Sequence, residues 1–477
     1  MTASLNSVNF SYKGTESGAL KNLTLEAHQG ECILLTGPSG CGKTTITRIL
    51  NGLIPSFYKG DITGSATLGS RPIAELKSYE LAKSMGSVFQ NPRTQFFNVD
   101  TDSEIAFGLE NNGEPTEKIN KRIDTVTKNL KIEKLRGRDI FKLSGGEKQK
   151  IAFASVYAMS PDIYLLDEPS SNLDTDGIEE LALCLRRVKA EGKTIIIAEH
   201  RIYYLMDIVD KVIYMKEGEI RNVYSREAFL RLSKNDLNSM GLRISRLSDL
   251  DEVAGIVESS SGGTARAAAR TADGTSTGSL KMANLSIMRG KKNLLSNLSL
   301  EFHPGEIVAI TGRNGLGKTT FIRTITGLHK EYSGEIYLDD KLLKSKELCK
   351  ESYLVMQDVN YQLFAESVRE ECTLGMKGID KKRVDEVLDI LGLLPFADRH
   401  PNTLSGGQKQ RLALAVSMIS DRKIIALDEP TSGLDYDNMV RTGEIVKELA
   451  KDGKIIIIVT HDKEFISSCC TRVVRLG

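Results

Sequence analysis

Five short motifs occur twice in this chain, complete and in the same order both times. Each set begins with a G-x-x-G-x-G-K-T loop, followed by a glutamine after an apolar run and then by L-S-G-G. Each set ends with an apolar run closing in Asp-Glu and a histidine after a second apolar run. The glycine-rich loops lie 275 positions apart and the Asp-Glu pairs 261, so the first copy carries 14 extra residues between those motifs. A repeat of this length predicts two similar domains.

The composition excludes several classes of protein. Lys and Arg number 64 against 63 Asp and Glu, and a net charge of +1 gives no support for a nucleic acid as the main partner. The longest apolar stretches have the length of a strand and fall short of the roughly 18–20 residues of a membrane helix. The N-terminus shows no secretory signal, and the seven cysteines show no metal-ligand spacing. We therefore expect a cytosolic protein that reaches a membrane only through partners.

The repeat also predicts the domain organisation. We expect a first domain over residues 1–257, whose tail from Lys216 contains a helical stretch near 225–233. Residues 258–279 are dominated by Ser, Gly, Thr and Ala, and this composition predicts a flexible linker. The second domain is expected over residues 280–477.

Each copy alternates strand patterns with helix patterns, as in a mostly parallel α/β core. Residues 31–36 and 306–311 are predicted strands that lead into the glycine-rich loops. Residues 163–166 and 424–427 are predicted strands that place Asp-Glu at their carboxyl ends, where α/β proteins bind ligands. Between the glutamine and L-S-G-G, each copy becomes helical and charged.

The glycine-rich loops have the pattern of a P-loop, whose backbone N–H groups close around phosphates at a helix N-terminus. Lys43 and Lys318 are expected to reach the β- and γ-phosphates of a nucleotide, and Thr44 and Thr319 are expected to ligate Mg²⁺. The predicted loop residues are Gly37, Pro38, Ser39, Gly40, Cys41, Gly42, Lys43, Thr44 and Thr45 in the first copy, and Gly312, Arg313, Asn314, Gly315, Leu316, Gly317, Lys318, Thr319 and Thr320 in the second.

The Asp-Glu pairs supply the chemistry that a nucleotide triphosphatase needs. Asp167 and Asp428 are expected to hold Mg²⁺, and Glu168 and Glu429 are the candidate general bases for the attacking water. The apolar run before each pair and the proline after it make a catalytic interpretation stronger than that of a solvated surface pair.

The full set resembles the nucleotide-binding domain of ATP-binding cassette (ABC) proteins. The resemblance implies ATP and Mg²⁺ as cofactors and two P-loop domains. Each would have a mostly parallel core sheet, an antiparallel β subdomain and a helical signature subdomain. It implies that His200 and His461 contact the γ-phosphate and that Gln90 and Gln357 lie beside the metal.

In ABC proteins two domains pack head to tail, and each L-S-G-G segment completes the site of the other domain. The resemblance therefore implies an intramolecular dimer in which Asp174 and Asp435 cross the interface. Glu147 replaces the Gln408 of the second copy, a mild departure that does not predict an inactive site. The signature residues are Ser405, Gly406 and Gly407 for the Lys43 site, and Ser144, Gly145 and Gly146 for the Lys318 site.

An aromatic residue before the P-loop stacks on adenine in ABC proteins, and Tyr12 fits that role. Aligning Leu20 and Asn22 with Leu295 and Asn297 places Ile287 opposite Tyr12. On this alignment we expect the second site to bind ATP more weakly, because an aliphatic side chain offers no π-face.

Both copies contain Q-x-x-x-x-Q-x-F, through Gln95 and Phe97 in the first and Gln362 and Phe364 in the second. This segment, with E-H-R at 199–201, resembles the ATPases of energy-coupling factor (ECF) importers, including the cobalt and nickel branch. There a groove after the glutamine grips the coupling helices of a transmembrane protein. The resemblance implies an ATPase at the cytoplasmic face of the membrane, with a transmembrane coupling protein and a substrate-capture protein as partners. The ATPase would make no direct contact with the substrate, which could be a vitamin, a vitamin precursor or a transition-metal ion.

Two alternatives remain open from the sequence. One is a soluble tandem ABC ATPase acting on ribosomes or DNA, but such proteins generally carry basic or helical arms, zinc-binding cysteines or coiled coils. The other is a fused sugar-importer ATPase, which usually has one degenerate site and lacks the paired Q-x-x-x-x-Q-x-F.

Overall fold

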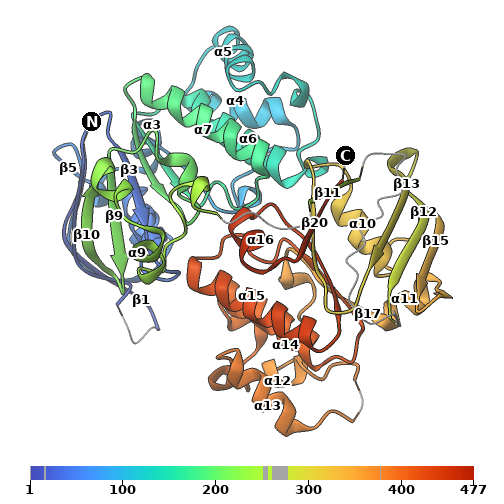
Figure 1. Cartoon of the computed structure of the whole chain (residues 1–477). Coiled ribbons are helices and arrows are strands. Elements are labelled where there is room, and N and C mark those ends of the chain that lie inside the picture. The colour runs from blue at the N-terminus through green and yellow to red at the C-terminus, as the bar shows by residue number, and fades with distance from the viewer. Residues whose placement is uncertain (1, 15–17, 251–255, 260–277, 377, 477) are drawn as a thin grey trace. The chain divides into compact units, whose positions relative to one another are not determined.

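The computed structural model describes the chain except for residues 1, 15–17, 251–255, 260–277, 377 and 477. It divides into two compact units, residues 1–249 with 435–437 and residues 250–434 with 438–477, whose elements are labelled in Figure 1. Among the described residues, no helix combines the length and the apolar character that crossing a membrane requires.

The first unit is built on two sheets. The larger has the order β10-β9-β3-β8-β7-β6 and is parallel except for its β10–β9 edge, and the smaller is antiparallel in the order β2-β1-β4-β5. The strands are β1 (Ala3–Tyr12), β2 (Leu20–Ala27), β3 (Cys32–Thr36), β4 (Gly60–Leu68), β5 (Arg71–Pro72), β6 (Met85–Val88), β7 (Ile163–Asp167), β8 (Thr194–Ala198), β9 (Lys211–Lys216) and β10 (Glu219–Ser225).

The apolar strands form the centre of this unit because both faces of the larger sheet are covered. All residues of β7 and β8 are buried. Within β7, Ile163 and Leu165 pack in the cluster that contains the antiparallel sheet, whereas Tyr164 and Leu166 pack in the helical cluster. A strand covered on both faces reads as a continuous apolar run, which is the pattern that the sequence shows.

In Figure 1, helices α4, α5, α6 and α7 of the first unit lie together on one side of strands β3, β9 and β10. Helices α4 and α5 lie between β6 and the signature helix α6 in the chain, so the expected helical subdomain is confirmed. The helices are α1 (Lys43–Leu50), α2 (Leu53–Ser56), α3 (Ser78–Ser84), α4 (Thr101–Asn111), α5 (Thr116–Asn129), α6 (Gly145–Met159), α7 (Thr175–Ala190), α8 (Arg226–Leu230) and α9 (Lys234–Ser239).

The second unit repeats this architecture. Its sheets have the orders β11-β20-β14-β19-β18-β17 and β13-β12-β15-β16. The strands are β11 (Ile256–Ser259), β12 (Leu280–Arg289), β13 (Lys292–Phe302), β14 (Ile307–Thr311), β15 (Tyr332–Leu338), β16 (Lys341–Leu342), β17 (Ser352–Val355), β18 (Ile424–Asp428), β19 (Ile455–Val459) and β20 (Arg472–Leu476). The helices are α10 (Lys318–Ile325), α11 (Ser345–Glu351), α12 (Val368–Glu371), α13 (Lys381–Ile390), α14 (Gly406–Ile419), α15 (Tyr436–Lys451) and α16 (Lys463–Cys469).

The edge of the second large sheet differs from the expected organisation. Strand β11 pairs in parallel with β20, from Ile256 opposite Val473 to Ser259 opposite Leu476. Residues 256–257 were expected in the tail of the first domain and 258–259 in the linker, yet their backbone lies in the second unit. Residues 260–277 of the expected linker lie outside the described residues.

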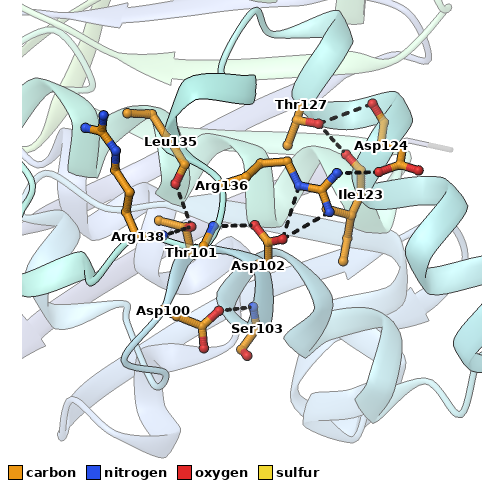
Figure 2. A network of polar contacts seen from close by, with 11 residues as sticks. Asp100, Thr101, Asp102, Ser103, Ile123, Asp124, Thr127, Leu135, Arg136 and Arg138 are labelled. Atoms are coloured by element: carbon orange, nitrogen blue, oxygen red, sulfur yellow. Dashed lines mark hydrogen bonds and ion pairs between the residues drawn. The ribbon is translucent and has the colours of Figure 1, made fainter.

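An ionic clamp ties the helical subdomain of the first unit together (Figure 2). The Arg136 Nε and Nη2 atoms donate to Asp102 Oδ2 at 3.1 and 3.0 Å, and Nη1 pairs with Asp124. Asp102 also accepts the Gly137 N–H at 3.1 Å, and Thr101 Oγ1 donates to the Leu135 carbonyl at 2.7 Å. The clamp therefore joins the first turn of α4, α5 and the loop that leads to the L-S-G-G segment.

The second unit has a matching clamp with the arginine moved. Arg369 occupies the α12 position that corresponds to Asp102, and it pairs with Asp385 on α13. Its Nε also lies 3.6 Å from Asp398 in the following loop. Both copies thus cross-link the same three segments, although the positive charge comes from the loop in one copy and from the helix in the other.

We predict that Arg136→Ala loosens this subdomain by about 1 kcal/mol, because one side chain bridges two helices although it is part-exposed. Amide exchange over 101–111 and 116–129 should accelerate about fivefold at low salt and less at high salt. Arg138→Ala is the matched control, since the Arg138 side chain forms an exposed ion pair with Glu147 at 3.5 Å. Equal exchange in the two variants would contradict the bridging role.

Candidate functional site

The P-loops follow strands β3 and β14 and end at the first residues of α1 and α10. Each loop crosses its neighbouring strand so closely that only glycine fits at the first position. A Cβ on Gly37 would lie 2.1 Å from the Met215 carbonyl oxygen, and one on Gly312 would lie 2.6 Å from that of Leu476. Both glycines also have positive φ, which an L side chain disfavours.

The P-loop lysines are buried and turn back onto their own loops. Lys43 Nζ donates to the carbonyls of Gly37 at 2.8 Å and Pro38 at 3.2 Å. Lys318 Nζ does the same with Gly312 at 2.6 Å and Arg313 at 2.9 Å. An ammonium group held at the centre of a ring of backbone groups is a ready site for phosphate oxygens.

The predicted metal ligands meet in both units. Thr44 Oγ1 donates to Asp167 Oδ1 at 3.0 Å, and Thr319 Oγ1 donates to Asp428 Oδ1 at 3.4 Å. Burial and the adjacent Glu168 charge raise the pKa of Asp167 to about 6, and burial raises the pKa of Asp428. One hydroxyl and one carboxylate, with phosphate oxygens, suit Mg²⁺, which rarely takes an all-protein cage. Among the described residues, no group of three or more His, Cys, Asp or Glu side chains forms a metal cage.

In the first unit, the predicted base Glu168 is held by two other predicted residues. Gln90 Nε2 donates to its Oε2 at 2.7 Å, and His200 Nε2 lies 3.4 Å from its Oε1. Burial alone would raise the pKa of Glu168, but His200 and Lys43 hold that pKa below its ordinary value, so the group is charged. Its φ of 45° is unusual for a residue with a side chain, and such strain clusters at functional sites.

In the second unit, the corresponding glutamate has different partners. Glu429 also has a positive φ, 49°, and its Oε1 lies 3.7 Å from His461 Nε2. Its Oε2 accepts from Thr460 Oγ1 at 3.3 Å and from the His461 N–H at 3.4 Å. Gln357 is exposed and lies two residues after the end of β17.

The signature serines begin helices α6 and α14. Ser144 and Ser405 are the N-cap residues, and the residue three positions later completes a capping box in each. Glu147 Oε2 accepts the Ser144 N–H at 2.8 Å, and Gln408 Oε1 accepts the Ser405 N–H at 2.8 Å. The Glu-for-Gln difference between the copies therefore preserves the local structure, because both side chains supply the same acceptor.

The position of Tyr12 exposes an error in the expected alignment. Strand pairing places Phe10 opposite Leu20 and Ile287 opposite Leu295, so Ile287 corresponds to Phe10 and Arg289 corresponds to Tyr12. Ile287 is fully buried, as Phe10 is. The prediction that Ile287 replaces Tyr12 is wrong because the first hairpin is two residues longer between these strands.

Tyr12 lies beside the first P-loop helix. Its hydroxyl is 3.2 Å from Thr45 Oγ1 and accepts from Arg48 Nη1 at 3.0 Å, and Arg48 also lies over the Tyr58 ring. The aromatic ring is therefore fixed next to the nucleotide-binding loop.

The Q-x-x-x-x-Q-x-F segment lines a large groove in the first unit, of about 610 Å³. Gln95 Oε1 accepts the Phe89 N–H at 3.2 Å and closes the segment into a loop. The buried Glu104 of α4 accepts the N–H groups of Phe97 and Asn98 at 3.0 and 2.9 Å. The Phe97 side chain itself is 75% exposed and stacks on Phe107, with ring centroids 4.9 Å apart.

The second unit holds its phenylalanine in the same way. Gln362 Oε1 accepts the Met356 N–H at 2.7 Å, and the buried Glu371 accepts the N–H groups of Phe364 and Ala365, both at 2.7 Å. Phe364 is 73% exposed. The neighbouring groove of about 310 Å³ includes Gln362 and Glu371 in its lining.

Sequence reasoning missed Glu104 and Glu371, which fix the exposed phenylalanines. Each lies seven positions after its phenylalanine, and this repeated spacing was the available signal. Glu199 entered the sequence analysis only as part of E-H-R, and its contacts were not predicted, although a carboxylate directly before the histidine in one copy only was a signal.

Known proteins share this arrangement over the whole chain. A Treponema denticola protein provisionally named an ABC transporter ATP-binding protein is 48% identical, over 99% of this chain and 95% of its own. A Bacillus subtilis protein provisionally named an HMP/thiamine import ATP-binding protein is 31% identical, over 98% of this chain and 88% of its own. An archaeal ribosome recycling factor, aABCE1, shares the fold with a TM-score of 0.65 at 23% identity, over 98% of this chain and 87% of its own.

The ABC transporter family matches residues 20–171 and 295–432, which include both P-loops, both signature segments and both Asp-Glu pairs. These matched segments hold the Thr–Asp pairs and the predicted bases Glu168 and Glu429. The chain therefore belongs to the ABC transporter family and carries two ATPase domains.

Proposed function

We propose that this chain is the ATP-hydrolysing subunit of an ECF-type importer, bound at the cytoplasmic face of a membrane beneath a transmembrane coupling protein and a substrate-capture protein. The observation that carries the proposal is the pair of exposed phenylalanines, Phe97 and Phe364, each held by a buried glutamate beside a groove. An exposed aromatic side chain on a backbone held by hydrogen bonds, at equivalent places in two domains, suits a surface that binds a partner helix.

The cargo is proposed to be a micronutrient: a vitamin, a vitamin precursor or a transition-metal ion. The Bacillus subtilis relative, named for HMP and thiamine import, supports the vitamin-precursor class. The likeness to the ribosome recycling factor extends to the fold alone, so it gives little support to a ribosomal role.

The residues of each site fit ATP with Mg²⁺. The Thr44–Asp167 and Thr319–Asp428 pairs would hold the metal, and Gln90 and Gln357 are proposed to border it. Bound Mg²⁺ would neutralise charge on the phosphate oxygens. Lys43 and Lys318 would bind those oxygens, Glu168 and Glu429 would take a proton from the attacking water, and His200 and His461 would orient the γ-phosphate.

The two domains are proposed to act as a head-to-tail pair. Ser405, Gly406 and Gly407 would complete the Lys43 site, and Ser144, Gly145 and Gly146 the Lys318 site, with Asp174 and Asp435 between them. The capped N-termini of α6 and α14 support this role, because a helix N-terminus attracts an anion.

Replacing both predicted bases tests hydrolysis. Glu168→Gln with Glu429→Gln should retain ATP binding but lower turnover by about 10²–10⁴-fold, because the bases are lost while the phosphate ligands remain. Steady-state ATPase rates and nucleotide titration give the two quantities. Glu179→Gln with Glu444→Gln, an equal charge change at exposed sites, is the control. Near-normal turnover in the first double variant would exclude these bases.

The partner surface is tested by Phe97→Asp and Phe364→Asp. Each should weaken assembly with the membrane protein by about 10- to 100-fold, because burying a phenylalanine contributes about 1.5–3 kcal/mol. The measurement is the fraction of tagged chain that sediments with native membranes.

Two residues serve as controls for that experiment. Phe141→Asp and Ile390→Asp alter equally exposed apolar residues, 73% and 71%, that lie outside both Q-x-x-x-x-Q-x-F segments. Membrane binding that survives Phe97→Asp and Phe364→Asp, or falls equally in the controls, would remove the main support for the importer.

The corrected alignment gives a further prediction. We propose that Tyr12 contacts adenine in the first site and that Arg289 does so in the second, since a guanidinium plane also stacks on aromatic rings. Tyr12→Ala and Arg289→Ala should each weaken ATP binding at their own site by about 2- to 13-fold. Titrations in Lys318→Ala and Lys43→Ala backgrounds separate the sites. Ile287→Val is the control and should change neither affinity.

A further inference from the structure

The residue before the switch histidine of the first unit is a buried carboxylate with four donors. Glu199, directly after β8, is 2% exposed. Its Oε1 accepts the N–H groups of His200 at 2.8 Å and Arg201 at 3.2 Å. Its Oε2 accepts the Ser170 N–H at 3.3 Å and the Tyr204 hydroxyl at 2.9 Å. One side chain therefore joins the switch loop, the loop after Asp-Glu and the turn at 203–205.

Tyr204 is suited to be a permanent donor to this carboxylate. Burial, and after it the Glu199 charge, hold the pKa of Tyr204 well above its ordinary value, so the hydroxyl keeps its proton. Four donors on two oxygens are the arrangement that lets a carboxylate stay buried without a large desolvation cost.

The second unit has Thr460 at this position, and its switch loop is held by a different group. The Thr460 hydroxyl and the His461 N–H both donate to Glu429 Oε2, at 3.3 and 3.4 Å. The carboxylate that supplies the acceptor there is thus the catalytic one. The Thr460 hydroxyl accepts the N–H of Asp462 at 3.1 Å, the counterpart of the Arg201 N–H, and the His461 N–H donates to Glu429 instead.

In the first unit, where Glu199 stands at the position of Thr460, the catalytic glutamate Glu168 has a different hydrogen-bond partner. Glu199 accepts the His200 N–H, and Glu168 Oε2 accepts the amide of Gln90 at 2.7 Å. Both glutamates therefore face the imidazole of their own switch histidine, but Glu168 is also bonded by Gln90, whereas Glu429 is also bonded by the Thr460 hydroxyl and the His461 N–H.

We propose that Glu199 is a positioning residue of the first ATP site: it holds the switch loop in place of Glu168 and so leaves Glu168 oriented by Gln90. The base of the first unit then depends on the loop that contains Gln90 as well as on His200, whereas the base of the second unit is bonded by residues of its own switch loop. This inference concerns the ATPase reaction itself and does not rest on the importer role.

The turnover test uses the full chain and three variants. Glu168→Gln first defines the share of ATP turnover that depends on the first base. Glu199→Gln, which is isosteric but turns an amide N–H₂ toward donors, should remove at least half of that share. Glu199→Thr introduces the residue of the second unit, so it should retain more than half. ATP affinity, titrated in a Lys318→Ala background, should stay within about twofold for both variants.

A double-mutant comparison separates positioning from general loosening. In the otherwise natural chain, Gln90→Ala should strongly lower the ATP turnover that depends on the first base. In the Glu199→Thr chain the effect of Gln90→Ala should be smaller. There Glu168 would accept the backbone N–H of His200, as Glu429 accepts that of His461.

Amide exchange in the nucleotide-free protein gives a readout independent of turnover. Glu199→Gln should accelerate exchange over 168–172 and 199–204 and leave the P-loop at 37–43 unchanged. Thermal unfolding distinguishes a folding defect, which would accelerate exchange throughout the unit. The proposal is overturned if Glu199→Gln removes less than half of the share, if ATP affinity falls in parallel, or if Gln90→Ala has equal effects in both backgrounds.

Discussion

Everything in each ATP site depends on how closely the P-loop crosses the end of the neighbouring strand. With no space for a Cβ at Gly37 or Gly312, the loop backbone lies directly on β9 or β20. The lysine can then turn back onto the loop carbonyls, and the following threonine reaches the aspartate at the end of β7 or β18. A larger residue would move the loop outward and separate the phosphate ligands from the carboxylates.

The two copies differ where several residue types can make the same contact, and they agree where the position of one group matters. The clamp of the helical subdomain exchanged its arginine between a loop and a helix, because only the joining of three segments matters there. The capping residue changed from Glu to Gln without altering the cap. In contrast, the Thr–Asp pairs and the buried glutamates that hold Phe97 and Phe364 recur with the same geometry, since position is what those residues supply.

Much of this architecture was predictable from the sequence. Buried parallel strands appear as apolar runs, and recognisable motifs follow directly after several of them. The strands before Gly37 and Asp167, and the helices between Gln90 and Ser144, lie where the patterns placed them. The register of the β1 hairpin was not predictable, because the residues used to align the two copies lie after the hairpin loop. An alignment that starts there cannot show that one hairpin is two residues longer than the other. Glu104 was missed for another reason: its role is to accept two backbone N–H groups, and no motif marks a carboxylate that serves the backbone.

The groove and the catalytic glutamate of the first unit are joined by a short physical route. Gln95, in the groove lining, accepts the N–H of Phe89, and the next residue, Gln90, donates to Glu168. A displacement of the groove lining therefore reaches Gln90 through one hydrogen bond and one peptide unit. In the second unit Gln362 anchors Met356 in the same way, but the carboxylate of Glu429 is bonded to Thr460 and His461. The two grooves are thus connected differently to Glu168 and Glu429, and the residue proposed to make the difference, Glu199, lies outside both grooves and directly before His200.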